Sequence, residues 1–317
     1  MSKSRIVNAN TIRYLANRLG QGLVVVFGAI AISFVLFNVL GRPADIIGGP
    51  FMTPEDRAAL NARLGYDRPL LDRFFHYITG IFRGDFGVSY RSSRNAIADV
   101  LAVLPNTIIL VLSAILLAGL IALPLAIFSV RHRETLRDRF LRRSVGFLQG
   151  MPEFWLSLML VLAFSVSIPL LPSFGFTQLS ALVLPTLALA LPIIPTFFRL
   201  FRGQLLDVLG NDFVEAMKAR GLSGRVIVYH HGLRNMVGPA ATFAALQLGY
   251  LLGGSLVVET IFSWPGIGNL AVSSITLRDF AVTQTIIIVI AVFYVVLNLV
   301  ADLVVLTSDP RIRVEST

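Results

Sequence analysis

The chain has no cysteine and little charge. None of its 317 residues is cysteine, which excludes a disulfide scaffold and thiolate metal sites or nucleophiles. Charged residues make up 14% of the chain, against about 25% in an ordinary soluble domain. The mean hydropathy is +0.76, and a soluble fold of this length could not hide so much apolar surface. We therefore expect an integral membrane protein.

Motifs for nucleotide hydrolysis and for metal-dependent hydrolysis are also missing. Lysine occurs only at Lys3 and Lys218, and neither follows a glycine, so there is no phosphate-binding loop of the form Gly-x4-Gly-Lys-Ser/Thr. The four histidines form no His-Glu-x-x-His motif. No clustered catalytic constellation stands out. We expect a protein that is not itself an enzyme and that holds no metal or cofactor.

Long uncharged runs dominate the sequence. A bilayer core about 30 Å thick is crossed by roughly 20 apolar residues in a helix. Five runs of 22 to 45 residues contain no charged residue, namely 19–40, 101–130, 154–198, 236–258 and 280–301. The 45-residue run is long enough for two helices, and the turn-forming Pro169, Pro172, Ser173 and Gly175 predict a break within it. The sequence predicts an all-α membrane protein with six transmembrane helices.

Basic residues gather in alternate connections between these runs. Residues 1–18 carry a net charge of +4, residues 131–143 carry +4 and residues 199–234 carry +3, whereas 41–100, 165–180 and 259–280 carry +1, 0 and −1. By the positive-inside rule, the three basic segments and both termini are cytoplasmic. This distribution explains the net charge of +9 and the pI of about 10.6 without a nucleic-acid partner.

The pattern predicts five parts along the chain. Residues 1–18 would be a cytoplasmic tail, and 19–40 an uncleaved first span, because this run exceeds a signal-peptide core and no small-residue cleavage pattern follows it. Residues 41–100 are too long for a turn and have helical periodicity at 53–64 and 69–82, which predicts a helical extracytoplasmic insertion. Residues 101–306 would form a five-helix membrane core that includes the connection 202–234, and 307–317 a cytoplasmic tail.

Small residues recur every four positions in two predicted spans: Ala114, Ala118 and Ala122 in one, and Ala241, Ala245, Gly249 and Gly253 in the other. Such stripes let two helices approach closely. They favour packing within the chain, and a seam between subunits is the alternative.

Interruptions and charges within the spans are few. Pro185, Pro192 and Pro195 are expected to interrupt the fourth span, either for packing or as a hinge. Glu153 and Asp302 lie near span ends. A proton- or sodium-coupled carrier would be expected to have a buried carboxylate or a comparable site, so the scarcity of such residues counts against that class.

The connection 210–235 is too organised for a linker. Asp212 and Glu215 have the spacing of a capping box, which predicts a helix start. One face of this helix would carry four residues, Phe213, Ala216, Met217 and Arg220. Gly221 predicts its end, and Ser223 can cap a second helix. A helix of about eight residues is too short to be stable alone, so we expect a partner surface to support it.

A helix-turn-helix DNA-binding motif has a similar turn, but a segment tethered between membrane spans is a poor candidate for docking on an operator. Glu215, Ala216 and Gly221 instead resemble the Glu-Ala-Ala-x3-Gly loop of permease subunits from binding-protein-dependent ABC importers. Met217 stands where that family has a second alanine, a conservative change on an apolar face. The residues that follow resemble the dipeptide, oligopeptide and nickel branch of the family: His231, Leu233, Arg234 and Asn235.

The resemblance extends over essentially the full chain. Motifs similar to those of the first permease subunit of this branch follow in order: 64–74 (LGYDRPLLDRF), 83–90 (RGDFGVSY), 104–110 (LPNTIIL), 257–270 (VVETIFSWPGIGNL) and 309–313 (DPRIR). One departure is SSRNAIADVL at 92–101, where the family has a Pro-Val pair.

The resemblance implies an importer built from several chains in a bacterial or archaeal plasma membrane. Its partners would be lipid, a second related permease subunit, an extracytoplasmic solute-binding protein, and two ABC ATPase subunits that hold ATP and Mg²⁺. The residues implied in ATPase coupling are Phe213, Glu215, Ala216, Met217, Gly221, His231, Arg234 and Asn235. Those implied in an extracytoplasmic gate or a binding-protein contact are Arg83, Asp85, Glu259, Trp264, Pro265 and Gly266, for which a purely structural turn is the alternative.

Two questions stay open at the level of sequence. An ion-gradient-driven secondary transporter is the alternative function, and an ATP requirement for uptake distinguishes the two. Dipeptides, oligopeptides, nickel chelates and glutathione are all candidate solutes. The pathway-facing polar residues are equally open among Gln149, Gln247, Tyr250 and Asn298.

Overall fold

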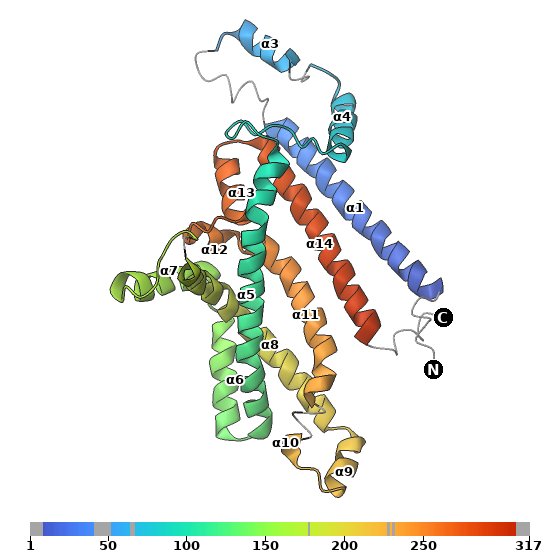
Figure 1. Ribbon diagram of the computed structural model, residues 1–317, viewed down its shortest axis with the longest axis vertical. Helices are drawn as coiled ribbons and strands as arrows, with labels where there is room; N and C mark the ends of the chain where they lie inside the picture. The colour runs from blue at the N-terminus through green and yellow to red at the C-terminus, as the bar shows by residue number, and fades with distance from the viewer. Residues whose placement is uncertain are drawn as a thin grey trace. The chain divides into compact units, whose positions relative to one another are not determined.

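The structure is a computed structural model that describes residues 9–40, 52–63, 67–176, 178–226, 229 and 232–308. Within these ranges the regular structure is helical, apart from one isolated antiparallel bridge between Val88 and Asn95 (Figure 1). The chain forms two compact units. The first is built mainly from Asn106–Pro265, and the second from Arg13–Pro105 and Gly266–Val295.

The first unit is organised around α8 (Val183–Leu209), which packs against four other helices of the unit. Its elements are the later part of α5 (Ala96–Arg131), α6 (Leu136–Leu148), α7 (Glu153–Val161), the π-helical turn η1 (Leu162–Ser167), the 3-10 turn η2 (Leu179–Leu182), α8, α9 (Asp212–Ala219), α10 (Gly224–Val226), α11 (Leu233–Gly254) and α12 (Leu256–Ile261). Buried apolar side chains from α5 and α8 dominate its core, among them Leu110, Leu184 and Phe197. Because α8 contacts most helices of this unit, the packing of the unit holds the helix whose C-terminal end leads to α9.

The second unit is held together by aromatic side chains. It contains α1 (Ala9–Leu40) from residue 13 onward, α3 (Pro54–Arg63), α4 (Leu70–Phe82), the start of α5, α13 (Ile267–Thr276) and the first part of α14 (Phe280–Ser308). The ring of Phe34 lies 5.2 Å from that of Phe74 and 5.6 Å from that of Tyr77, between ring centroids. Phe37 and Phe280 are 5.0 Å apart in the same measure. These contacts join α1 to α4 and to α14.

Within the described part of the chain, four helices are long and apolar enough to cross a membrane: Ala16–Asn38, Ala96–Arg131, Leu179–Leu209 and Phe280–Leu303. They correspond to four of the predicted spans. Leu136–Leu148 and Glu153–Ser167 make a fifth candidate if they count as one span, but they meet at 93°. The predicted span 236–258 corresponds to α11, which is not among these helices. The described residues therefore contain four or five candidate spans, where the sequence predicts six.

The predicted break inside 154–198 is confirmed, whereas the expected interruption by proline is wrong. Residues 168–176 and 178 lie outside helices, and Gly175 has a φ of +76°. In contrast, α8 continues through Pro192 and Pro195. A proline removes one backbone hydrogen bond, but neighbouring helices hold the segment in place. Pro195 is itself buried, so packing outweighs the local preference for a break.

The two stripes of small residues have different surroundings. Ala114, Ala118 and Ala122 are fully buried in the core of the first unit, as expected for packing within the chain. On α11, Ala245 is buried but Gly253 is exposed, and no atom lies within 4 Å of a Cβ added at Gly253. Part of the second stripe is therefore not covered by the described residues of this chain.

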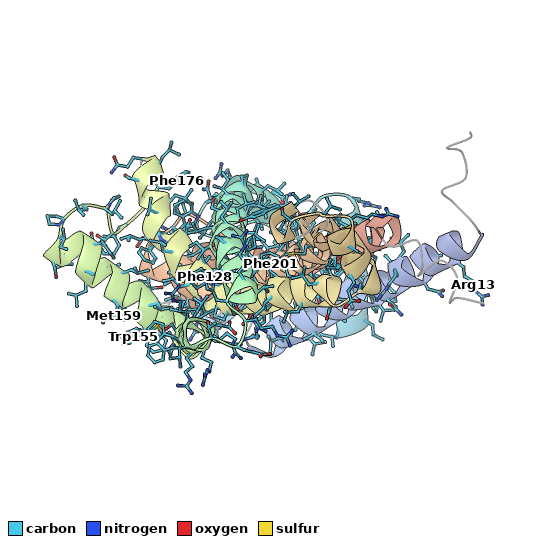
Figure 2. The ribbon with its side chains drawn as sticks, turned by 90° about the horizontal axis from the view of Figure 1, so that it is seen from below. Arg13, Phe128, Trp155, Met159, Phe176 and Phe201 are labelled. Carbon is cyan, nitrogen blue, oxygen red and sulfur yellow. The ribbon has the colours of Figure 1, made fainter. Side chains whose placement is uncertain are left out.

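Large apolar side chains are exposed along several helices. Leu23 on α1 and Leu120 on α5 are 71% and 72% exposed. Trp155 and Met159 lie one turn apart on α7, and both are exposed (Figure 2). Apolar surface of this extent requires lipid or another protein to cover it. The helices α3 and α4 confirm the helical periodicity predicted at 53–64 and 69–82. Residues 1–8 and 309–317 of the predicted tails lie outside the described residues.

Candidate functional site

The segment with the coupling-loop motif contains α9, which follows α8 after two residues. The helix begins at Asp212, and Gly221 beyond its end has a φ of +81°, a conformation that favours glycine. The N–H of Leu222 donates to the carbonyl of Met217 at 3.1 Å, which is the hydrogen bond of a Schellman helix end. Ser223 Oγ accepts from the N–H of Val226 at 3.5 Å, at the start of α10. The predicted start and end of the first helix agree with α9, and α10 begins directly after Ser223, as predicted. The predicted continuation of the second helix into the fifth span falls partly on residues outside the described ones.

The faces of α9 are only partly accounted for by the sequence pattern. Val214 is fully buried, Met217 is half-buried and Glu215 is exposed. Val214 was not among the predicted residues, because a periodic pattern does not distinguish a face packed on its own chain from a face left for a partner. His231 lies outside the described residues, as do the side chains of Phe213, Ala216, Arg234 and Asn235.

A buried carboxylate lies where the sequence predicts the second group of site residues. Glu259 on α12 is fully buried. Its Oε1 accepts hydrogen bonds from the hydroxyl of Thr107, at 2.8 Å, and from that of Ser255, at 3.1 Å. Thr107 belongs to α5, so this carboxylate connects α5 to α12.

The turn after α12 is held by side chains of the same unit. Trp264 is fully buried, and its Nε1 donates to the carbonyl of Asn106 at 3.1 Å. In return, Nδ2 of Asn106 donates to the carbonyl of Pro265 at 2.8 Å. The ring of Phe176 packs on Trp264 with 4.4 Å between centroids. We call Asn106, Thr107, Phe176, Glu259, Trp264 and Pro265 the Trp264 cluster.

The sequence identified half of the Trp264 cluster. Glu259, Trp264 and Pro265 were predicted, whereas Asn106, Thr107 and Phe176 were given no role. A signal for two of them was present, because Asn106 and Thr107 are a polar pair inside an apolar run. Gly266, the last predicted residue of this group, belongs to the second unit, where it precedes α13.

The motif 83–90 forms a tight turn in the second unit. Gly84 and Gly87 have φ of +80° and +84°. Asp85 Oδ1 accepts from the N–H of Gly87 at 3.0 Å, which stabilises the turn. Arg83 and Asp85 are both exposed, in contrast to Glu259 and Trp264.

A buried hydrogen bond ties this motif to α14. Ser89 Oγ donates to Asp279 Oδ2 at 2.6 Å, and both residues are buried. Asp279 Oδ1 in turn accepts from the N–H of Val282 at 3.3 Å, in the first turn of α14. Sequence reasoning did not assign a role to either residue.

A cavity of about 510 Å³ in the second unit is lined by residues of α1, α4, the turn 85–90 and α14. Arg73, which donates to Asn38 Oδ1, lies in its wall. The Tyr77 hydroxyl oxygen is buried and has no hydrogen-bond partner among the described residues, and burial raises the pKa of Tyr77. Across the ranges that the structure describes, no group of three or more His, Asp or Glu could hold a metal ion.

The chain is similar to one transport family over nearly its full length. The profile described as "Binding-protein-dependent transport system inner membrane component" matches residues 118–314. A second profile, for the N-terminal part of such membrane components, matches residues 11–111.

Individual relatives match over almost their entire length. The glutathione transport system permease protein GsiC of Salmonella typhimurium is 34% identical over 304 residues, which cover 95% of this chain and 99% of the relative. GsiC of Escherichia coli K12 is 32% identical over 303 residues, with the same coverage of each chain. An inward-facing structure of the MetNI methionine ABC transporter matches with a TM-score of 0.55 and 17% identity, over 67% of this chain and 97% of the other. This last likeness concerns the fold.

Proposed function

The chain belongs to the family of binding-protein-dependent transport system inner membrane components, and from this premise we propose that it is one permease subunit of an ATP-driven importer for peptide-like solutes. The observation that carries the coupling part of the proposal is α9, a short helix with a defined start and a Schellman end in the connection that bears the family's loop motif. The chain has no phosphate-binding loop of its own, so ATP and Mg²⁺ would bind to partner subunits. Two relatives are named for glutathione transport, which makes glutathione the first solute to test.

In this proposal α9 docks on an ATPase subunit. A helix of eight residues is about 12 Å long and is stabilised chiefly by what it packs against. Phe213, Ala216 and Met217 would face the ATPase, with the exposed Glu215 at the helix start. Gly221 would set the direction in which the chain leaves the helix. The residues that would support the return to α11 are His231, Arg234 and Asn235.

We further propose six spans with both termini in the cytoplasm. The four helices of sufficient length would be joined by α7 with η1, the apolar half of the bent pair, and by α11, which has 22 residues and no charged residue from Met236 onward. The insertion that contains α3 and α4 would then be extracytoplasmic. The alternation of basic and nearly neutral connections supports this orientation.

The proposed assembly contains this chain, a second related permease, two ATPases and a solute-binding protein. The partly exposed stripe on α11 supports a permease partner, since the space around Gly253 would admit a closely packed helix. The exposed Arg83 and Asp85 are the proposed contacts for the binding protein. Glu259 and Trp264 are fully buried, and we assign the Trp264 cluster to the closed gate at the outer end of the first unit instead.

A substitution at Gly221 tests the coupling proposal. The assembly, purified through a tag on this chain and placed in vesicles with its binding protein, should accumulate radiolabelled glutathione or a labelled dipeptide only when ATP is present on the ATPase side. Gly221→Asp should reduce this uptake at least tenfold while the subunits stay associated. No atom lies within 4 Å of a Cβ added at Gly221, but its φ of +81° is strained for any residue with a side chain, so the loss would come from the changed helix end and not from a clash within the described part of the chain.

Gly146→Asp is the control for the added charge; it lies within α6 and does not share the left-handed backbone of Gly221. It introduces the same charge at another exposed glycine with open space around the added Cβ, and it should leave uptake unchanged. Normal ATP-stimulated uptake in Gly221→Asp would contradict the role of α9. Uptake driven by an ion gradient without ATP would favour a secondary transporter instead.

A further inference from the structure

A second buried carboxylate lies in the first unit, near the start of α6. Asp138 has no exposed surface. Its Oδ1 accepts a hydrogen bond from the hydroxyl of Ser129, near the end of α5. Its Oδ2 lies 3.4 Å from Nη2 of Arg202 on α8, and 3.3 Å from Nε of Arg142 on α6. One side chain therefore contacts three helices.

The contacts around Asp138 form a closed ring. Nε of Arg202 donates to Ser129 Oγ at 2.8 Å, so Asp138, Ser129 and Arg202 each contact the other two. We call these three residues the Asp138 node. Arg142 is 45% exposed and reaches the node from its edge. The side chain of Thr135 accepts from the N–H of Asp138 and caps α6, which fixes where that helix begins.

The node stabilises one relative position of its three helices. A buried carboxylate is costly unless its oxygens are hydrogen-bonded and its charge is paired. Ser129 supplies the bond to one oxygen and Arg202 the charge beside the other, so displacement of α5 or of α8 from α6 would leave Asp138 incompletely paired. The C-terminal end of α5 and the helices α6 and α8 should therefore move together, because separating them would leave the charge of Asp138 unpaired.

The node also lies close to α9 along the chain. Arg202 is followed by seven residues of α8, which ends at Leu209, and α9 begins at Asp212 (Figure 1). Seven helical residues span about 10 Å. A displacement of α9 acts first on this end of α8. The Asp138 node is the polar connection through which α8 would carry α5 and α6 with it.

We propose that Asp138 is a positioning residue for ATP-coupled transport. Through its contacts with Ser129 and Arg202, it makes the C-terminal end of α5 and the helices α6 and α8 move as one body with α9. The inference rests on the proposed function and specifies how a movement of α9 is transmitted through α8 to α5 and α6. Asp138 would touch neither nucleotide nor solute. Its effect would be on the amount of solute moved for each ATP hydrolysed.

Neutralising Asp138 tests this assignment in the complete assembly. In Asp138→Asn, labelled glutathione moved per ATP hydrolysed should fall about tenfold, while the rate of ATP hydrolysis changes by less than twofold. Glu134→Gln removes the same charge in the same connection, but from a side chain that is 81% exposed, and it should leave the ratio unchanged. Arg202→Lys keeps the charge but loses the Nε bond to Ser129, and should be intermediate. A purely structural role would reduce both rates in parallel, and that result would overturn the proposal.

A distance measurement tests the common movement directly. The chain has no cysteine, so with cysteine-free partner subunits, spin labels at Arg139→Cys on α6 and Asp207→Cys on α8, both exposed positions, report on this pair of helices. We expect one narrow distance distribution in the nucleotide-free assembly and the same one after trapping with ATP and vanadate. Asp138→Asn should broaden it. A nucleotide-dependent change with the node intact would overturn the proposal, and so would an unchanged distribution in Asp138→Asn.

The two tests separate this proposal from the function on which it rests. If the unmodified assembly neither hydrolyses ATP nor takes up solute with ATP, the proposed function fails. If ATP drives uptake but the labels move apart in the cycle, the function stands and the role of Asp138 is wrong.

Discussion

Thr107 illustrates how one hydroxyl group can determine the surroundings of a buried carboxyl group. It donates to Glu259 across 152 positions of sequence, from α5 to α12. The sequence places Glu259 in the connection after the fifth predicted span and shows few ionisable residues within the spans. The structure buries Glu259 completely. The number of carboxyl groups within the predicted spans is therefore smaller than the number that the structure buries.

Replacing this donor should destabilise the protein. Thr107→Val keeps the shape of the side chain but takes one hydrogen bond away from buried Glu259, which costs about 1–3 kcal/mol. Thermal unfolding of the purified assembly, followed by circular dichroism, should show a melting temperature lowered by several degrees. Thr107→Ser keeps the hydroxyl and is the control. An equal loss in both variants would show that the methyl group, not the hydrogen bond, matters at this position.

At the scale of elements, the alanine stripe on α5 shows how closely helices of the first unit approach. Ala118 has no exposed surface and lies in the core of that unit. Ala118→Leu should overpack the core at a cost of about 1–3 kcal/mol. Gly119→Leu adds a side chain at the neighbouring position, where a Cβ meets no atom within 4 Å, and should be nearly neutral. Melting temperatures of the two variants in the same detergent test this difference, and equal effects would contradict the packing of the stripe.

Elements also differ in how well local preferences determine them. The bounds of α9 follow from Asp212 and from Gly221, whose positive φ is easily reached by a residue without a side chain. In α8, by contrast, Pro192 and Pro195 do not break the helix. The difference is packing: α8 is the central helix of its unit, and its neighbours hold it in place where the local preference alone would end it.

At the scale of the whole molecule, the alternation of charge predicts which connections share a side of the membrane. Glu55 on α3 and Glu134 between α5 and α6 are both exposed, and the chain has no native cysteine. In sealed right-side-out vesicles, a membrane-impermeant maleimide should label Glu55→Cys directly and Glu134→Cys only after detergent is added. The reason is that basic connections are retained in the cytoplasm. Labelling of both positions in sealed vesicles would contradict the six-span orientation.

The sequence by itself determined the helical membrane class, three of the four candidate spans (near 19–40, 101–130 and 280–301), the break that begins at 168 and the bounds of α9. Each of these depends on composition or backbone preference within a short stretch of chain. Only the tertiary structure decided which polar residues meet in the interior. Ser129, Asp138 and Arg202 lie up to 73 positions apart, and Thr107 and Glu259 lie 152 apart. Such pairs form because helix packing brings distant segments together, and no periodicity along the chain encodes that packing.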